Sequence, residues 1–354
     1  MYKMEWMGMN AIINTIYEMP MKFYPEHEYY CFKNCYLQIL RYYQVKDSEF
    51  YIDCTTEWTF NFDEASSFGY NFGTGEVYSS FIGPYANQVT TKDITQYSTD
   101  ELWTYNCEAV KQGIPIVVAT DVYHLSYTPF FHKKNSFHSL ILSGWNENEN
   151  SWSVVDWYPP WFYRGTIVTN ELDNARGSAN EGDGILSGHP INYMCAEVSR
   201  TGWDKRSKDL ISLQIQQQLD SFYTDKQQNI YKGFHAIKQL FSLTEKYLVC
   251  NPNQRTEFLE DLYQKCFFVP TRKNLFKWYL EMAAERYGPI KYRMAILMHQ
   301  ETIQAWKGLL SLLIKSAMSF NEQIHEMILK QILLIYEKEK TNYFTLYELS
   351  RSVF

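Results

Sequence analysis

The hydrophobic pattern of this chain changes its period once, near residue 202, and this change limits the possible folds more than any single motif. Before it, short β-branched and aromatic runs such as Ile114–Thr120 alternate with turn residues. After it, apolar residues recur at helical spacing in nearly every segment. The division predicts an α+β amino-terminal domain, residues 1–205, followed by an all-helical domain, residues 206–354.

Two regions of the amino-terminal half are rich in turn-forming residues and show neither a helical nor a strand pattern of apolar residues. Phe68–Gly75 contains three glycines and reads as a loop. Residues 164–200 contain two glycine-rich polar stretches and suggest a long loop before a last strand near Tyr193–Val198.

Composition excludes several classes of protein. The 354 residues have a net charge of −7, which argues against a nucleic-acid or anionic-membrane partner. The longest apolar stretches, such as Leu309–Ile314, are far too short to cross a bilayer. No signal peptide is readable, and the seven scattered cysteines read as reduced thiols, so we expect a cytoplasmic protein. Neither zinc-type spacing nor a phosphate-binding glycine motif occurs, so we predict no metal and no bound nucleotide cofactor.

A cysteine opens the first amphipathic segment. From Cys31, apolar residues follow every three or four positions, which predicts a helix ending near Gln44. Unpaired N–H groups and the macrodipole at a helix N-terminus favour a thiolate, so Cys31 is the candidate nucleophile. The alternative is a small buried apolar residue, the usual role of a free cysteine. Cys35 competes as nucleophile, but its place on the apolar face predicts that it packs.

A histidine and an aspartate are expected to meet on a hairpin. Phe137–Gly144 and Trp152–Asp156 are predicted strands that pair across a polar turn. His138 starts the first and Asp156 ends the second, so the carboxylate would orient the imidazole toward a thiol. A hydrogen-bonded strand-end histidine and a turn carboxylate are the alternatives. Other candidates for the base are His27, His124, His132 and His189.

Several motifs, taken in order, resemble the butirosin biosynthesis protein H family, which has a papain-like fold. The resemblance covers roughly residues 28–315. In the amino-terminal half it is carried by a nucleophile helix, a glycine-rich loop, a Gly-x-Pro strand, an Asp-x-Tyr-x-Leu-x-Tyr element, a histidine strand and an acid strand. These correspond to Cys31–Gln44, Phe68–Gly75, Gly113–Pro115, Asp121–Tyr127, His138–Trp145 and Val154–Asp156.

The resemblance implies a papain-like cysteine-hydrolase core, made of an N-terminal helix and an antiparallel sheet, followed by a helical domain. It also implies an acyltransferase that moves an acyl group from a carrier-protein thioester to an amine of a natural-product acceptor. Cys31 would attack the thioester, His138 would move the proton and Asp156 would orient His138. The phosphopantetheine arm of the acyl carrier protein is then a substrate, and the small-molecule acceptor is the second partner.

The donor to the oxyanion is the least determined part of this site. Papain-like enzymes usually place a glutamine shortly before the cysteine, and no glutamine precedes Gln38 here. His27 or a backbone amide is therefore expected to serve. Asp121, Tyr123 and His124 follow a strand end and are further candidates for oxyanion or substrate contacts.

Carrier proteins are typically acidic, so a net-negative enzyme would need a local basic patch. Lys205–Lys208 and Arg272–Lys277 are candidates, and solvated helix faces are the alternative for both. Two other functions remain open: a cysteine peptidase or amidase on the same fold, and a non-catalytic binding protein of a biosynthetic assembly. The sequence is compatible with a homo-oligomer.

Overall fold

The chain forms two compact units in the computed structural model, which describes residues 31–75, 83–158, 161–182, 186–223, 230–318 and 322–353. The first unit comprises Met1–Ser48 and Tyr85–Trp203, and the second comprises Glu49–Pro84 and Asp204–Phe354. The sequence-based division assigned every residue up to 205 to the first domain. In the structure, the described residues 49–75 and 83–84 belong to the helical unit.

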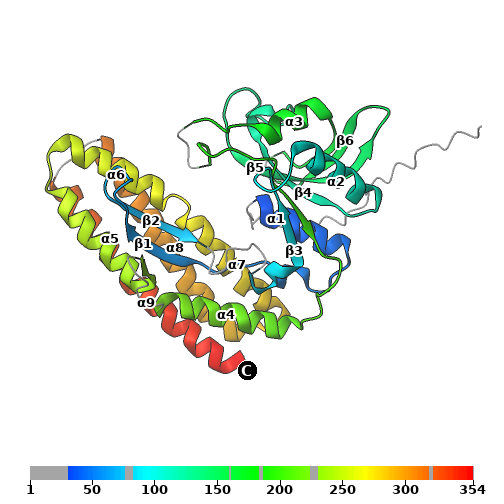
Figure 1. The fold of residues 1–354 in the computed structure, drawn as a ribbon. Coiled ribbons are helices and arrows are strands. Elements are labelled where there is room, and N and C mark those ends of the chain that lie inside the picture. The colour runs from blue at the N-terminus through cyan, green and yellow to red at the C-terminus, as the bar shows by residue number, and fades with distance from the viewer. Residues whose placement is uncertain are drawn as a thin grey trace, which may run out of the picture. The chain divides into compact units, whose positions relative to one another are not determined.

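The first unit is built on an antiparallel sheet (Figure 1). Its described strands follow the order β3-β8-β4-β5-β6-β7. The predicted hairpin is present, since β5 and β6 are paired antiparallel with Leu142 opposite Val154. Elements of this unit are α1 (Cys31–Tyr42), η2 (Gly83–Gln88, at its edge), β3 (Val89–Lys92), α2 (Thr99–Lys111), β4 (Ile116–Asp121), η3 (Val122–His124), β5 (Phe137–Asn146), β6 (Ser151–Asp156), β7 (Tyr163–Val168), α3 (Thr169–Gly177) and β8 (Cys195–Val198).

A compact apolar core ties α2 and α3 to this sheet. Leu102 of α2 and Leu172 of α3 share one buried cluster with Leu140 of β5 and Trp152 of β6. Each fully buried leucine contributes about 1.5–3 kcal/mol through the area it removes from water. The loop predicted over residues 164–200 is wrong in its first part, because residues 163–177 form β7 and α3. The last predicted strand is confirmed as β8.

Helices α1 and α2 end in the same way on different residues. Gly113 has φ 70°, and the N–H of Ile114 bonds to the carbonyl of Ala109 at 2.9 Å. Gln44 has φ 57°, and the N–H of Val45 bonds to the carbonyl of Leu40 at 2.9 Å. Both are Schellman-type helix ends, which need one residue with positive φ. Glycine favours this conformation, and it is present after α2 but not after α1.

Replacing Gln44 with glycine is expected to raise the free energy of unfolding by about 0.5–1 kcal/mol, because glycine adopts positive φ without a Cβ penalty. Urea denaturation at an unchanged m-value measures the gain. Gln44→Ala is the matched control and should be neutral or slightly destabilising. An equal gain from alanine would mean that the positive φ is not the cause.

The second unit combines a small sheet with long helices (Figure 1). The described strands are ordered β2-β1-β9, all antiparallel. The prediction of a loop at Phe68–Gly75 is wrong, because Tyr70–Gly75 is a strand paired with β1, with Trp58 stacked on Phe72 at 6.4 Å. Its elements are η1 (Ser48–Tyr51, at its edge), β1 (Glu57–Phe62), β2 (Tyr70–Gly75), α4 (Ser207–Tyr223), β9 (Ile230–Lys232), α5 (Gly233–Leu248), α6 (Pro252–Cys266), α7 (Val269–Tyr287), α8 (Pro289–Met318) and α9 (Glu322–Val353).

The α+β class with a helical second part, predicted from the sequence, is confirmed by these two units. Within the described ranges, no helix combines the length and apolar character needed to cross a bilayer.

A buried ion pair lies inside the helical unit. The Nζ of Lys273 is 2.9 Å from the carboxylate of Glu339, and the indole N–H of Trp306 donates to the same carboxylate at 3.0 Å. Lys273 is only 1% exposed. A buried charge requires such partners. The basic patch predicted at Arg272–Lys277 therefore has its central lysine in the core, where no partner protein can reach it.

Candidate active site

Helix α1 carries Cys31 in its first described turn. The residue is half-buried, and its thiol is not part of a disulfide. Burial opposes ionisation, but the hydrogen bond and the positive charge of His138 outweigh it, and a hydrogen bond from Ser139 adds to them. The pKa of Cys31 is therefore below its ordinary value. A lowered pKa makes the thiolate, which is the nucleophilic form, available near neutral pH.

His138 and Asp156 meet as the hairpin predicts. The Nε2 of His138 is 2.9 Å from Oδ2 of Asp156, and both residues are buried, at 3% and 1% exposed. Burial opposes protonation of the imidazole, but the charge and hydrogen bond of Asp156 raise the pKa of His138 to about 10, with Cys31 adding to the rise. An imidazolium bonded to a carboxylate on one side can stabilise a thiolate on the other.

Two residues that the sequence did not single out hold Asp156 in place. The hydroxyl of Tyr127 donates to Oδ2 of Asp156 at 2.7 Å, and the indole N–H of Trp161 donates to the same oxygen at 2.6 Å. With His138, three donors converge on one buried carboxylate oxygen. These bonds fix the orientation of the carboxylate toward His138. Tyr127 closes the Asp-x-Tyr-x-Leu-x-Tyr element, which was the one sequence signal for it; Trp161 had none.

Aromatic rings enclose the imidazole. Trp161 and Tyr158 each lie 5.3 Å from the ring of His138 in edge-to-face geometry. These rings limit the access of water to the His138–Asp156 bond, and a hydrogen bond in a dry environment is electrostatically stronger.

Cys35 occupies the structural position expected of it. It is 4% exposed, and its Sγ is 3.6 Å from the hydroxyl oxygen of Ser139. Burial raises the pKa of Cys35 well above its ordinary value. The two cysteines of α1 therefore differ in the property that matters for a nucleophile, because only Cys31 has its pKa lowered.

The carboxylate of Asp121 is buried and bonded to the loop that follows it. Asp121 is fully buried, and its carboxylate accepts hydrogen bonds from the amides of Tyr123 and Ser136, both at 3.0 Å. The side chains of Asn135 and Ser178 donate to its other oxygen at 2.6 and 2.7 Å. These four bonds favour a role for Asp121 in fixing the 121–136 loop. A direct contact with the oxyanion is unfavourable, because a carboxylate would repel it.

The other residues predicted as site candidates lie in different places. Tyr123 and half-buried His124 line a cavity of about 510 Å³ together with Asp173 and Glu181. Burial lowers the pKa of His124, so its imidazole is mostly neutral at pH 7. His27 lies outside the described residues. Two alternative bases, His132 and His189, are exposed.

The first unit therefore carries a candidate cysteine–histidine–aspartate site, with Cys31 on α1, His138 on β5 and Asp156 on β6. Residues 63–157 match the family model described as butirosin biosynthesis protein H, N-terminal. This match confirms the resemblance predicted from the sequence, and it includes His138 and Asp156. It begins after Cys31, so the case for the thiol rests on its contacts with His138. No curated protein matches the chain.

Proposed function

We propose that this protein is a cysteine-dependent acyltransferase that takes an acyl group from a phosphopantetheine thioester and passes it to an amine. The observation that carries the proposal is the 2.9 Å bond between His138 and buried Asp156, and the effect of this His138 in lowering the pKa of Cys31 supports it. The matched family model, whose name refers to butirosin biosynthesis, favours a biosynthetic reaction.

In the first half-reaction the Cys31 thiolate attacks the carbonyl carbon of the thioester. The tetrahedral intermediate collapses with cleavage of the carbon–sulfur bond to the phosphopantetheine arm. His138, protonated while paired with the thiolate, gives its proton to the departing thiol. The acyl group is then held as a thioester on Cys31, and the arm is released as a free thiol.

In the second half-reaction the acceptor amine attacks the acyl-enzyme carbonyl. His138, now neutral, accepts the proton that the amine loses as the new carbon–nitrogen bond forms. The Cys31–acyl bond breaks, and the thiolate and imidazolium are restored. Asp156 stabilises each imidazolium, and Tyr127 and Trp161 keep its oxygen directed at His138. The backbone N–H of Cys31 is the proposed oxyanion donor.

Incubating the protein with an acyl-N-acetylcysteamine thioester and measuring its intact mass tests the first half-reaction. An added acyl mass on the tryptic peptide that carries Cys31 is the expected result. No adduct with any of several acyl chain lengths would favour a non-catalytic binding protein.

Adding amines to the acyl-enzyme tests the second half-reaction. Amide formation that exceeds release of the free acid is expected for a transferase. Hydrolysis at the same rate with and without amine would instead indicate a peptidase or amidase.

A further inference from the structure

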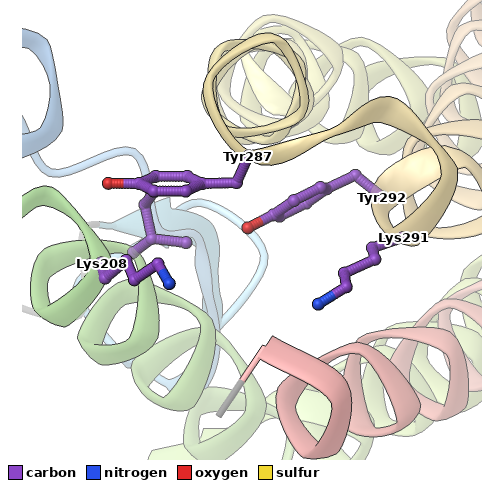
Figure 2. A pocket seen from close by; sticks show the side chains of 5 residues that line it. Lys208, Tyr287, Lys291 and Tyr292 are labelled. Carbon is purple, nitrogen blue, oxygen red and sulfur yellow. The ribbon is translucent and has the colours of Figure 1, made fainter.

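A small pocket in the helical unit gathers positive charge, and within the described residues no carboxylate lines it. It has a volume of about 60 Å³ and is lined by Lys208, Ile211, Tyr287, Lys291 and Tyr292. On this measure a cavity needs only about 10–15 Å³ to hold one water molecule, so the pocket is large enough for a small polyatomic ion. Figure 2 shows the two lysine side chains reaching toward this space from separate helices.

Tyr292 presents an unused hydrogen-bond donor to this pocket. Its side chain is 1% exposed, and its hydroxyl points into the pocket (Figure 2). Among the described residues, its hydroxyl has no hydrogen-bond partner. A hydroxyl that faces a pocket without a protein partner is free to bond to water or to a ligand that enters the pocket. Burial, with a contribution from Tyr287, raises the pKa of Tyr292 to about 12, so the group is a neutral O–H donor at pH 7.

The hydroxyl of the neighbouring Tyr287 already has a partner and does not face the pocket. Its hydroxyl is 2.5 Å from Oγ of Ser207 and points away from the lysines. Its ring lies 5.5 Å from the Nζ of Lys208 and forms a wall. The donors that face the space are therefore Lys208, Lys291 and Tyr292.

The helices increase the positive potential of this pocket. Lys208 lies in the first turn of α4, and Lys291 lies in the first turn of α8, which has no acidic residue there. Helix N-termini carry partial positive charge, so lysines at these positions are unfavourable without an anion. In the described part of the chain, neither lysine forms an ion pair, and Lys291 donates only to the backbone carbonyl of Ser352 at 3.3 Å. The one acid nearby in the first turn of α4, Asp209, is bound to Arg206 at 2.9 Å.

We propose that Lys208, Lys291 and Tyr292 form a binding site for the phosphate group of a phosphorylated ligand. Two ammonium groups and a phenolic O–H match the charge and the acceptor oxygens of a phosphate, and the volume admits one such group. The site lies within the helical unit, and its occupancy does not depend on the chemistry proposed for Cys31.

Isothermal titration calorimetry with inorganic phosphate, at constant ionic strength set with sodium chloride, tests the site. Lys208→Gln and Lys291→Gln should each weaken phosphate binding by about tenfold or more, since each removes a charge-assisted bond. Tyr292→Phe should weaken it about fivefold to tenfold. Lys307→Gln, an exposed lysine farther along α8, is the matched control and should bind as the parent does.

Thermal unfolding separates binding from folding. Without phosphate, Tyr292→Phe should melt at or slightly above the parent temperature, because its hydroxyl has no protein partner to lose. With phosphate, the parent should gain stability and the Phe variant should gain much less. No binding by the parent, or equal binding by all variants including Lys307→Gln, would overturn the proposal.

The same titration distinguishes the sources of the phosphate. Tighter binding of 4′-phosphopantetheine than of inorganic phosphate, with no binding of pantetheine, would assign the site to the phosphorylated arm. Equal binding of phosphopantetheine and phosphate would assign it to the free ion. Binding of pantetheine as tight as that of phosphopantetheine would overturn a phosphate site.

Discussion

Replacing Cys31 with alanine is expected to reduce acyl loading from a thioester by at least about a thousandfold, because the variant has no nucleophile to form the covalent intermediate. Of the two cysteines in α1, only Cys31 has a lowered pKa, and His138 is the cause. Intact-mass measurement of the acyl adduct over time gives the rate directly.

Cys35→Ala is the matched control, because it removes a thiol from the same helix. This thiol is buried with its pKa raised, so loading should stay within a few-fold of the parent. Any loss should appear as lowered stability, since a buried side chain is truncated. Equal loss of loading in both variants would contradict the assignment of Cys31. Alkylation by iodoacetamide adds a check, because Cys31 should react faster than Cys54 or Cys107.

Replacing Asp156 with asparagine is expected to slow acyl loading by about a hundredfold to ten-thousandfold, since the imidazolium loses its carboxylate partner. The pKa of His138 should fall from about 10, because the charge and hydrogen bond of Asp156 raise it. A neutral His138 no longer stabilises the thiolate, so the pKa of Cys31 should rise. The direct repulsion between Asp156 and Cys31 is the weakest influence on that thiol, so its removal will not reverse the sign.

The pH profile of Cys31 alkylation measures this change. In the parent protein, reactivity should begin below the ordinary pKa of a cysteine, because the imidazolium lowers the pKa of Cys31. In Asp156→Asn the profile should move toward higher pH by about one unit or more.

Tyr127→Phe, which removes one donor to Asp156 and keeps the ring, should shift the profile less and in the same direction. An unchanged profile in Asp156→Asn would mean that the carboxylate does not act through His138.

The sequence predicted those parts of this site that follow from the spacing of apolar residues in a short segment. The spacing of apolar residues after Cys31 predicts a helix, and the two runs ending in Asp156 predict a hairpin that brings His138 to the same end. Both predictions follow from the periods of helix and strand, which are properties of the backbone. They are present in α1 and in the β5–β6 pair.

Two predictions failed because contacts distant in the sequence outweigh the local composition. Glycines at Gly69, Gly73 and Gly75 predict a loop, yet residues 70–75 form a strand that pairs with β1, and Phe72 stacks on Trp306 at 6.2 Å. The composition of Arg272–Lys277 predicts a surface patch, yet Lys273 is buried and paired with Glu339, 66 residues later. Neither Trp306 nor Glu339 lies within a local sequence window of the segment it contacts.

The sequence alone therefore predicted the two kinds of fold in this chain and proposed Cys31, His138 and Asp156 as the thiol site, since both inferences rest on local periodicity and on the order of motifs. Only the tertiary structure decided what surrounds them. It directed Tyr127 and Trp161 onto one oxygen of Asp156, lowered the pKa of Cys31 while raising that of Cys35, and left Tyr292 facing two lysines. Those outcomes depend on distances between residues far apart in the chain, and burial and neighbouring charges set their strength.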